Sequence, residues 1–225
     1  MWLKHASPKE IMASKILSEK VEKVRQFRLS SKAKTTNGYA KVPQLFAQIT
    51  QPDDVDFLII PSVSSERRRY VPIGFATQDI ISSNAVQIVP NATLYHFGVL
   101  TSNVHMAWMR AVCGRLKSDY RYSKEIVYNT FPWPKPTEEQ KIKIEQTAQM
   151  ILNAREQYSD CSLADMYGEK MYLFPELVKA HQDNDRAVMQ AYGFTKGSEA
   201  YKSEAACVAE LMKLYQKKVE ELEKR

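Results

Sequence analysis

The residues best suited to chemistry in this sequence are the charged side chains of one short segment, Arg115–Tyr122. Its odd positions are all charged and its even positions are mostly apolar or aromatic. A period of two places alternate side chains on opposite faces of a strand, so we expect one charged face and one face packed on a core. Such a face could read DNA bases. A solvent-exposed strand face whose charges only keep it soluble remains the alternative.

Within this segment, Lys117, Asp119 and Arg121 are the predicted base-reading residues. Lysine and arginine can bond guanine O6 and N7, and aspartate can accept a hydrogen bond from the cytosine amino group. A second group of cations is predicted to contact phosphates. It includes three adjacent arginines, 67–69, which repel one another unless an anion or a carboxylate lies nearby. A solvated turn partly neutralised by Glu66 is the other interpretation of those arginines. The predicted phosphate-contacting residues are Arg67, Arg68, Arg69, Arg115 and Lys124.

The charge distribution favours a polyanionic partner. The formal net charge is +6, but residues 1–136 hold 19 Lys and Arg against 10 Asp and Glu, whereas residues 137–225 hold 13 against 16. Excess cations supply the phosphate attraction that dominates nucleic-acid affinity. No apolar run approaches the roughly 20 residues that span a bilayer, and polar residues follow Met1 closely, so we expect no membrane partner and a cytoplasmic location. Three widely spaced cysteines also fit a reducing compartment.

The elements that must position these residues follow from capping and periodicity. Ser7 and Glu10 flank Pro8 in a capping box that predicts an opening helix, followed by a polar stretch, 30–41, that is either a mobile loop or a linker. Short apolar runs separated by turn residues predict a β-rich middle. The predicted strands are 55–63, 70–75, 85–89, 94–100, 115–122 and 123–128, with a helix from Thr101-Ser102 to about Gly114.

The remainder is predicted to be helical, from a second capping box at Thr137 and Gln140 onward. The predicted helices are 138–158, 162–167, 175–192 and 198 to the end. The expected fold class is therefore α+β: a mixed β-rich domain with inserted helices, followed by an all-α helical bundle. The expected division is 1–41 as a connecting helix and linker, 42–136 as the recognition domain and 137–225 as the helical domain.

Catalytic patterns are missing from the sequence. It has no glycine-rich phosphate loop and no nucleophile or zinc motif, and its only carboxylate pair that faintly suggests a nuclease, Asp53-Asp54, lacks a fitting partner. We therefore predict no catalytic residue, no metal site and no cofactor in this chain.

Five stretches of the chain resemble the target recognition domain of MmeI-like type II restriction–modification enzymes. These stretches are Tyr70–Phe75, Pro90–Tyr95, His105–Trp108, Cys113–Ser123 and Tyr128–Pro134. The tail from Thr137 resembles the helical C-terminal domain of the same family, and the opening helix resembles the segment that joins its methyltransferase to its recognition domain. The resemblance covers essentially the whole chain.

The resemblance implies that the chain is a DNA-recognition fragment of a bacterial enzyme. Full-length members carry a nuclease and an adenine methyltransferase, so S-adenosylmethionine and Mg²⁺ are expected in the parent enzyme, and its methyltransferase domain and double-stranded DNA are the expected partners. The resemblance also implies that Lys117 and Asp119 act together on one base pair. The competing hypothesis is a protein-interaction or scaffold module that uses the C-terminal helices.

Overall fold

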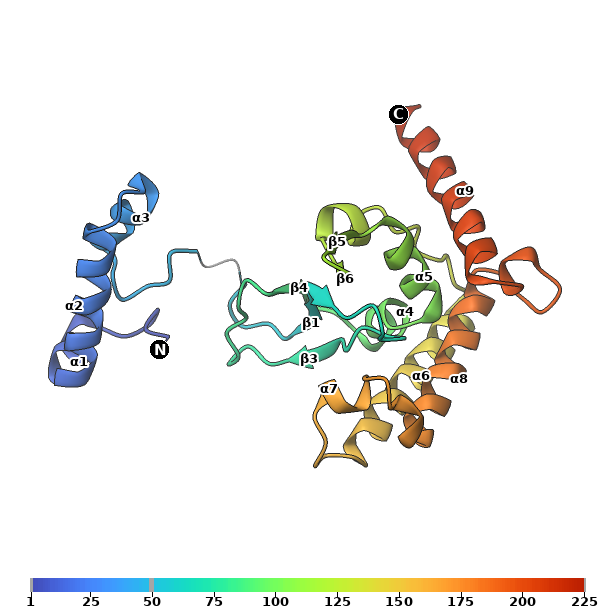
Figure 1. The fold of residues 1–225 in the computed structure, drawn as a ribbon, viewed down its shortest axis with the longest axis horizontal. Helices are drawn as coiled ribbons and strands as arrows, with labels where there is room; N and C mark the ends of the chain where they lie inside the picture. The colour runs from blue at the N-terminus through green and yellow to red at the C-terminus, as the bar shows by residue number, and fades with distance from the viewer. Residues whose placement is uncertain (1, 49–50, 225) are drawn as a thin grey trace. The chain divides into compact units, whose positions relative to one another are not determined.

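A computed structural model describes residues 2–48 and 51–224 of the chain. The chain divides into two compact units, Met1–Asp53 and Asp54–Arg225 (Figure 1).

The first unit consists of short helices. They are α1 (Pro8–Ala13), α2 (Lys15–Leu29), α3 (Lys34–Gly38) and the 3₁₀ turn η1 (Tyr39–Lys41). The capping box at Ser7 is confirmed, but the helix that it opens ends at Ala13 because Ser14 is extended and its side chain caps α2 at Leu17 N. The prediction of a loop or linker over 30–41 was wrong, since α3 and η1 occupy most of it.

The second unit begins with two small antiparallel sheets. One contains β1 (Phe57–Pro61), β3 (Gly74–Ala76) and β4 (Val86–Pro90) in the order β3-β1-β4. The other contains β2 (Val63–Ser64), β5 (Gly114–Leu116) and β6 (Asp119–Arg121) in the order β2-β6-β5. The β-rich middle is therefore confirmed, with shorter strands than predicted.

Two predicted strands are helical. Residues 94–100 form α4 (Leu94–Leu100), and residues 123–128 contain the π-helical turn η2 (Lys124–Tyr128). Periodicity alone does not separate a short buried strand from a short buried helix. Capping decides here: Thr93 and His96 form a reciprocal cap at α4, and the Ser123 side chain accepts from Ile126 N at η2.

Helices make up most of the rest of the second unit, as predicted. They are α5 (Asn103–Val112), α6 (Glu138–Glu156), α7 (Leu163–Met166), η3 (Met171–Leu173), α8 (Pro175–Ala191), η4 (Glu199–Tyr201) and α9 (Glu204–Glu223). The capping box of Thr137 with Gln140 is confirmed at α6. The last predicted helix, from Ser198, is split into η4 and α9, because Ser203 caps a new start.

One hydrophobic core runs through the second unit. Buried Ile60 of β1, Trp108 of α5 and Ile151 of α6 belong to the same cluster. The contact between α4 and α6 is especially close, since a Cβ on Gly98 would lie 2.7 Å from Ile144 Cγ2. The sheets and the C-terminal helices are therefore packed as one body, and the α+β fold class is confirmed.

Within residues 2–48 and 51–224, no helix combines the length and the apolar character that crossing a membrane requires.

Candidate functional site

The charged segment 115–122 is a β-hairpin and not the single strand that its alternation predicts. Leu116 of β5 pairs with Asp119 of β6, so Lys117 and Ser118 form the turn. Lys117 has a φ of 56°, in the left-handed region that residues other than glycine seldom adopt. The turn places Lys117 at the tip of the hairpin, where its side chain is exposed.

The two tyrosines of this segment anchor the hairpin in the core. Tyr120 and Tyr122 are 8% and 3% exposed. The Tyr122 hydroxyl lies 3.0 Å from His105 Nε2, and the Tyr122 amide donates to Ser62 O at 2.9 Å. Burial lowers the pKa of His105 to about 3, so its imidazole is neutral at pH 7 and can accept a hydrogen bond from the Tyr122 hydroxyl. The apolar half of the predicted alternation is therefore correct for both tyrosines.

Arg115 stabilises the turn. Its guanidinium lies 4.1 Å from the centre of the Tyr120 ring, and its Nη1 donates to Ser118 O at 2.9 Å. A cation over an aromatic face and a hydrogen bond to the turn carbonyl both favour the hairpin conformation. The guanidinium retains further N–H donors for another partner.

The three predicted base-reading side chains carry no internal partner. Lys117 and Arg121 are exposed and Asp119 is half-buried. None of the three side chains forms an ion pair or hydrogen bond with another described residue. Because Asp119 and Arg121 flank the buried Tyr120 on β6, they lie on the side of the strand away from the core. Their hydrogen-bonding groups are available to a ligand.

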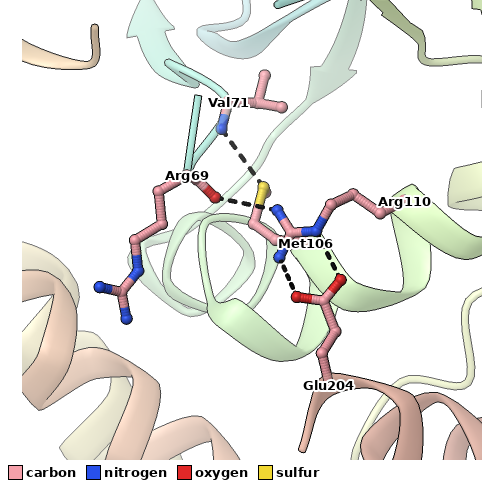
Figure 2. A network of polar contacts seen from close by, with 5 residues as sticks. All are labelled: Arg69, Val71, Met106, Arg110 and Glu204. Atoms are coloured by element: carbon pink, nitrogen blue, oxygen red, sulfur yellow. Dashed lines mark hydrogen bonds and ion pairs between the residues drawn. The ribbon is translucent and has the colours of Figure 1, made fainter. Parts of the chain in front are cut away.

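The three adjacent arginines follow β2, and the backbone carbonyl of the last one, Arg69, is bound by a side chain of α5 (Figure 2). Arg110 of α5 donates to Arg69 O at 3.2 Å and makes a two-pronged ion pair with Glu204, at 2.7 and 2.8 Å. The Arg69 side chain extends away from that pair, as Figure 2 shows. α9 thus fixes the arginine segment through Arg110 without neutralising the Arg69 guanidinium.

The side chains of the arginine segment differ in their surroundings. Arg67 pairs with Glu169 at 2.8 Å, but both side chains are mostly exposed, so the pair contributes little stability. Arg68 is half-buried, and the Arg69 guanidinium lies 5.4 Å from the Tyr70 ring centre. A pocket of about 480 Å³ lies beside all three. On η2, the remaining predicted cation, Lys124, is exposed and 3.7 Å from Glu125.

A buried polar network that the sequence reasoning missed joins α8 to Tyr70, directly after the arginine segment, and to the start of α5. The Tyr70 hydroxyl donates to Asp185 Oδ2 at 2.7 Å, and the backbone N–H of Asn103 donates to Asp185 Oδ1 at 2.8 Å. Burial raises the pKa of Asp185 from 3.8 to about 6, although both hydrogen bonds act in the opposite direction. The Tyr70 ring also stacks on His181, with ring centres 4.1 Å apart.

Arg155 of α6 makes a second buried connection. Its Nη1 donates to Ile73 O at 2.8 Å, and its Nε donates to the Tyr167 hydroxyl at 2.8 Å. Polar residues at core-facing positions of a helix are the sequence signal that marks such connections. The C-terminal helices therefore hold the residues just before β3 through directed bonds as well as through apolar packing.

No group of three metal-ligating side chains occurs among the residues that the structure describes. The hairpin and the arginine segment carry exposed charged groups, and the buried network holds the backbone that follows the arginine segment.

Comparisons with known proteins identify the family of this chain. The profile of the MmeI target recognition domain matches residues 1–135, and that of the MmeI C-terminal domain matches residues 136–223. DNA methyltransferase A of Bacillus subtilis (strain 168) is 36% identical over 220 residues, which cover 98% of this chain and 24% of that protein.

A solved structure is also similar. It is described as the type IIL restriction-modification enzyme MmeI in complex with DNA, is 46% identical and has a TM-score of 0.89, covering 96% of this chain and 28% of that one. The present chain thus spans about a quarter of the length of each relative. It belongs to the MmeI family, in which it corresponds to the target recognition domain followed by the C-terminal domain.

Proposed function

We propose that this chain recognises a specific sequence in double-stranded DNA. The observation that carries the proposal is the hairpin, on which Lys117, Asp119 and Arg121 have hydrogen-bonding groups that no described residue satisfies. A two-stranded β-ribbon fits the major groove, and these side-chain types match the donor and acceptor pattern of base edges there. A solved structure of a similar protein, MmeI, is a complex with DNA, which supports the same class of partner.

In this proposal, Lys117 and Asp119 specify one G·C pair. The ammonium donates to the guanine acceptors while the carboxylate accepts from the amino group of the paired cytosine. Arg121 reads a further base. Because the two residues carry opposite charges, they add base discrimination without adding net attraction to phosphate.

The proposed phosphate contacts come from exposed or half-buried cations around the hairpin. They fix the register on the duplex and carry no sequence information. These residues are Arg67, Arg68, Arg69, Arg115 and Lys124. Arg115 serves the hairpin as well, since one of its N–H groups is bound to Ser118 O.

We assign the chemistry to a longer protein of which this chain is the recognition part. Its S-adenosylmethionine and Mg²⁺ would be bound outside this chain, and its methyltransferase domain would be the intramolecular partner. Within the chain, 42–136 is the proposed recognition domain and 137–225 the proposed helical domain.

Selection from a library of duplexes with a randomised centre tests the proposal. The 225-residue chain is incubated with the library at about 50 mM salt, and the bound DNA is sequenced over several rounds. We expect enrichment of one short sequence that contains a G·C pair whose loss weakens binding, because one mismatched pair typically costs about 1–3 kcal/mol. Retention of DNA without any enriched sequence would contradict sequence recognition.

Salt dependence separates this function from the competing scaffold hypothesis. Binding through phosphates falls steeply as salt rises, whereas docking of apolar helices does not. A DNA affinity that is unchanged between about 50 and 200 mM salt would therefore contradict the proposal.

A further inference from the structure

The positive charge of the chain lies in the first compact unit. Residues 1–53 contain ten Lys and Arg against four Asp and Glu, whereas residues 54–225 contain 22 of each. The whole net charge of +6 therefore belongs to the α1–α3 unit, and the unit that carries the hairpin is neutral. The division of net charge thus follows the boundary between the two compact units, after Asp53.

Most cations of the first unit are exposed and unpaired. Lys4 is bound to Asp53 and Arg25 to Glu22, so two of the four carboxylates are used. From α2 onward, six lysines are exposed, and their ammonium groups have no ion pair or hydrogen bond with any described residue. They are Lys15, Lys20, Lys23, Lys32, Lys34 and Lys41.

The fold explains why these lysines face outward. Leu17 and Val21 of α2 are half-buried, and Arg28 donates to the carbonyls of Tyr39, Val42 and Leu45 at 2.8–3.0 Å. Those contacts occupy one side of α2 and hold the following segment against it. At 100° per residue, Lys15 and Lys23 lie about 160° and about 120° around the helix from Leu17, so they point away from the packed side.

We propose that the α1–α3 unit contacts the DNA phosphate backbone and supplies much of the sequence-independent affinity of this chain. Unpaired, exposed ammonium groups attract phosphates and release counterions from DNA. The second unit has cations around its hairpin but no net charge, so an added basic unit increases the phosphate attraction that gives most of the affinity. This inference rests on the proposed DNA-binding function and adds where its electrostatic part lies.

A protein surface is the rival occupant of the same unit. Ile16 and Phe27 of α2 are 67% and 72% exposed, and exposed apolar side chains often mark protein contacts. The lysines favour phosphate because their charge is not balanced locally: only Glu19 on α2 is an acid without an ion pair or hydrogen bond to a described side chain.

The test measures duplex binding by fluorescence anisotropy across about 50–300 mM salt, with the full chain throughout. The variant is Lys15→Gln/Lys20→Gln/Lys23→Gln, since glutamine preserves helix propensity and removes three charges. Each lost phosphate contact reduces the slope of log affinity against log salt by about 0.9. We expect a slope reduced by about 2–3 and an affinity at least about tenfold weaker at 0.1 M salt.

A matched control removes the same charge from exposed lysines of the second unit that likewise have no ion pair with a described residue, as Lys143→Gln/Lys196→Gln/Lys217→Gln. We expect its slope and affinity to stay close to those of the unmodified chain. Equal effects of the two triple variants would overturn the inference, because the attraction would then depend only on total charge. Unchanged slopes in both this α2 variant and the second variant described next would overturn it too and would favour the protein partner.

A second variant keeps the test independent of the folding of α2. Lys32→Gln/Lys34→Gln/Lys41→Gln removes the three lysines that follow it, and circular dichroism checks helix content in both variants. A reduced slope in either folded variant supports the inference, and unchanged slopes in both contradict it. If the unmodified chain shows no salt-dependent DNA binding, the proposed function itself fails, which is a different outcome.

Discussion

Lys117 and Asp119 flank Ser118 at the tip of the β5–β6 hairpin and form no ion pair with each other. Opposite charges so close in sequence often pair at a surface. Here the left-handed backbone of Lys117 turns the chain between them, with a φ of 56°. Both groups are consequently left for a ligand that offers an acceptor and a donor side by side, as the edge of a G·C pair does.

Because the backbone of Lys117 is left-handed, we expect that one substitution there can remove base recognition without lowering stability. Lys117→Gly relieves a conformation that is unfavourable for other residues, so the free energy of unfolding should stay equal or rise by up to about 1 kcal/mol. The same variant removes the ammonium, so discrimination at one base pair should be lost. Urea denaturation and library selection measure the two effects. Destabilisation by more than about 1 kcal/mol would contradict the strain.

The arginine segment is predicted to bind phosphate rather than bases. Arg68→Gln should weaken binding to all duplexes alike and reduce the salt slope by about 0.9, without changing the selected sequence. Lys196→Gln, an exposed lysine of the same unit, is the charge-matched control. A changed selected sequence with an intact slope would mean that Arg68 reads a base.

Close packing between α4 and α6 makes Gly98 sensitive to any side chain. An added Cβ would lie 2.7 Å from Ile144 Cγ2 and 3.0 Å from Asn184 Oδ1. Gly98→Ala should therefore lower the free energy of unfolding by about 1–3 kcal/mol. Gly197→Ala is the control, since nothing lies within 4 Å of its Cβ position. Equal stability of the two variants would show that α4 and α6 are less closely packed.

Asp185 gives a pH dependence to stability. Its pKa is raised from 3.8 in water to about 6 in the folded chain, so between these values the folded state binds more protons than the unfolded state. Stability therefore falls as pH rises from about 4 to 6, the opposite of the usual effect of a paired carboxylate. Asp185→Asn lacks this titration. The difference in unfolding free energy, unmodified chain minus variant, should decrease over that range, and parallel profiles would contradict the raised pKa.

Local signals in the sequence predicted the helices well. Ser7 with Glu10 and Thr137 with Gln140 are reciprocal caps whose bonds depend on neighbours three residues apart, so sequence alone is sufficient to find them. Residues 94–100 were assigned wrongly because their apolar side chains are buried in either conformation. The cap that decides it uses His96 at the third helical position, where the usual pattern has Glu or Gln.

The candidate site was predicted in residue type but not in geometry. The alternation of 115–122 correctly identified Tyr120 and Tyr122 as buried, yet it missed the turn, because Lys-Ser lacks the glycine or asparagine that marks a two-residue hairpin. The hydrogen bond between Tyr70 and Asp185 and that between Arg155 and Ile73 join residues more than 80 positions apart. Such contacts depend on the packing of distant elements, which no local pattern encodes.

The most direct test of base reading exchanges the two hairpin charges. The variant Lys117→Glu/Asp119→Arg keeps the net charge, so phosphate attraction and salt slope should not change. Glu199→Lys/Lys202→Glu is a charge-neutral control at an exposed ion pair away from the hairpin. Library selection should return G·C at one position for the unmodified chain and the control, and C·G at that position for the hairpin variant, with every other position conserved. The same selected sequence from all three proteins would contradict the claim that Lys117 and Asp119 specify a base pair.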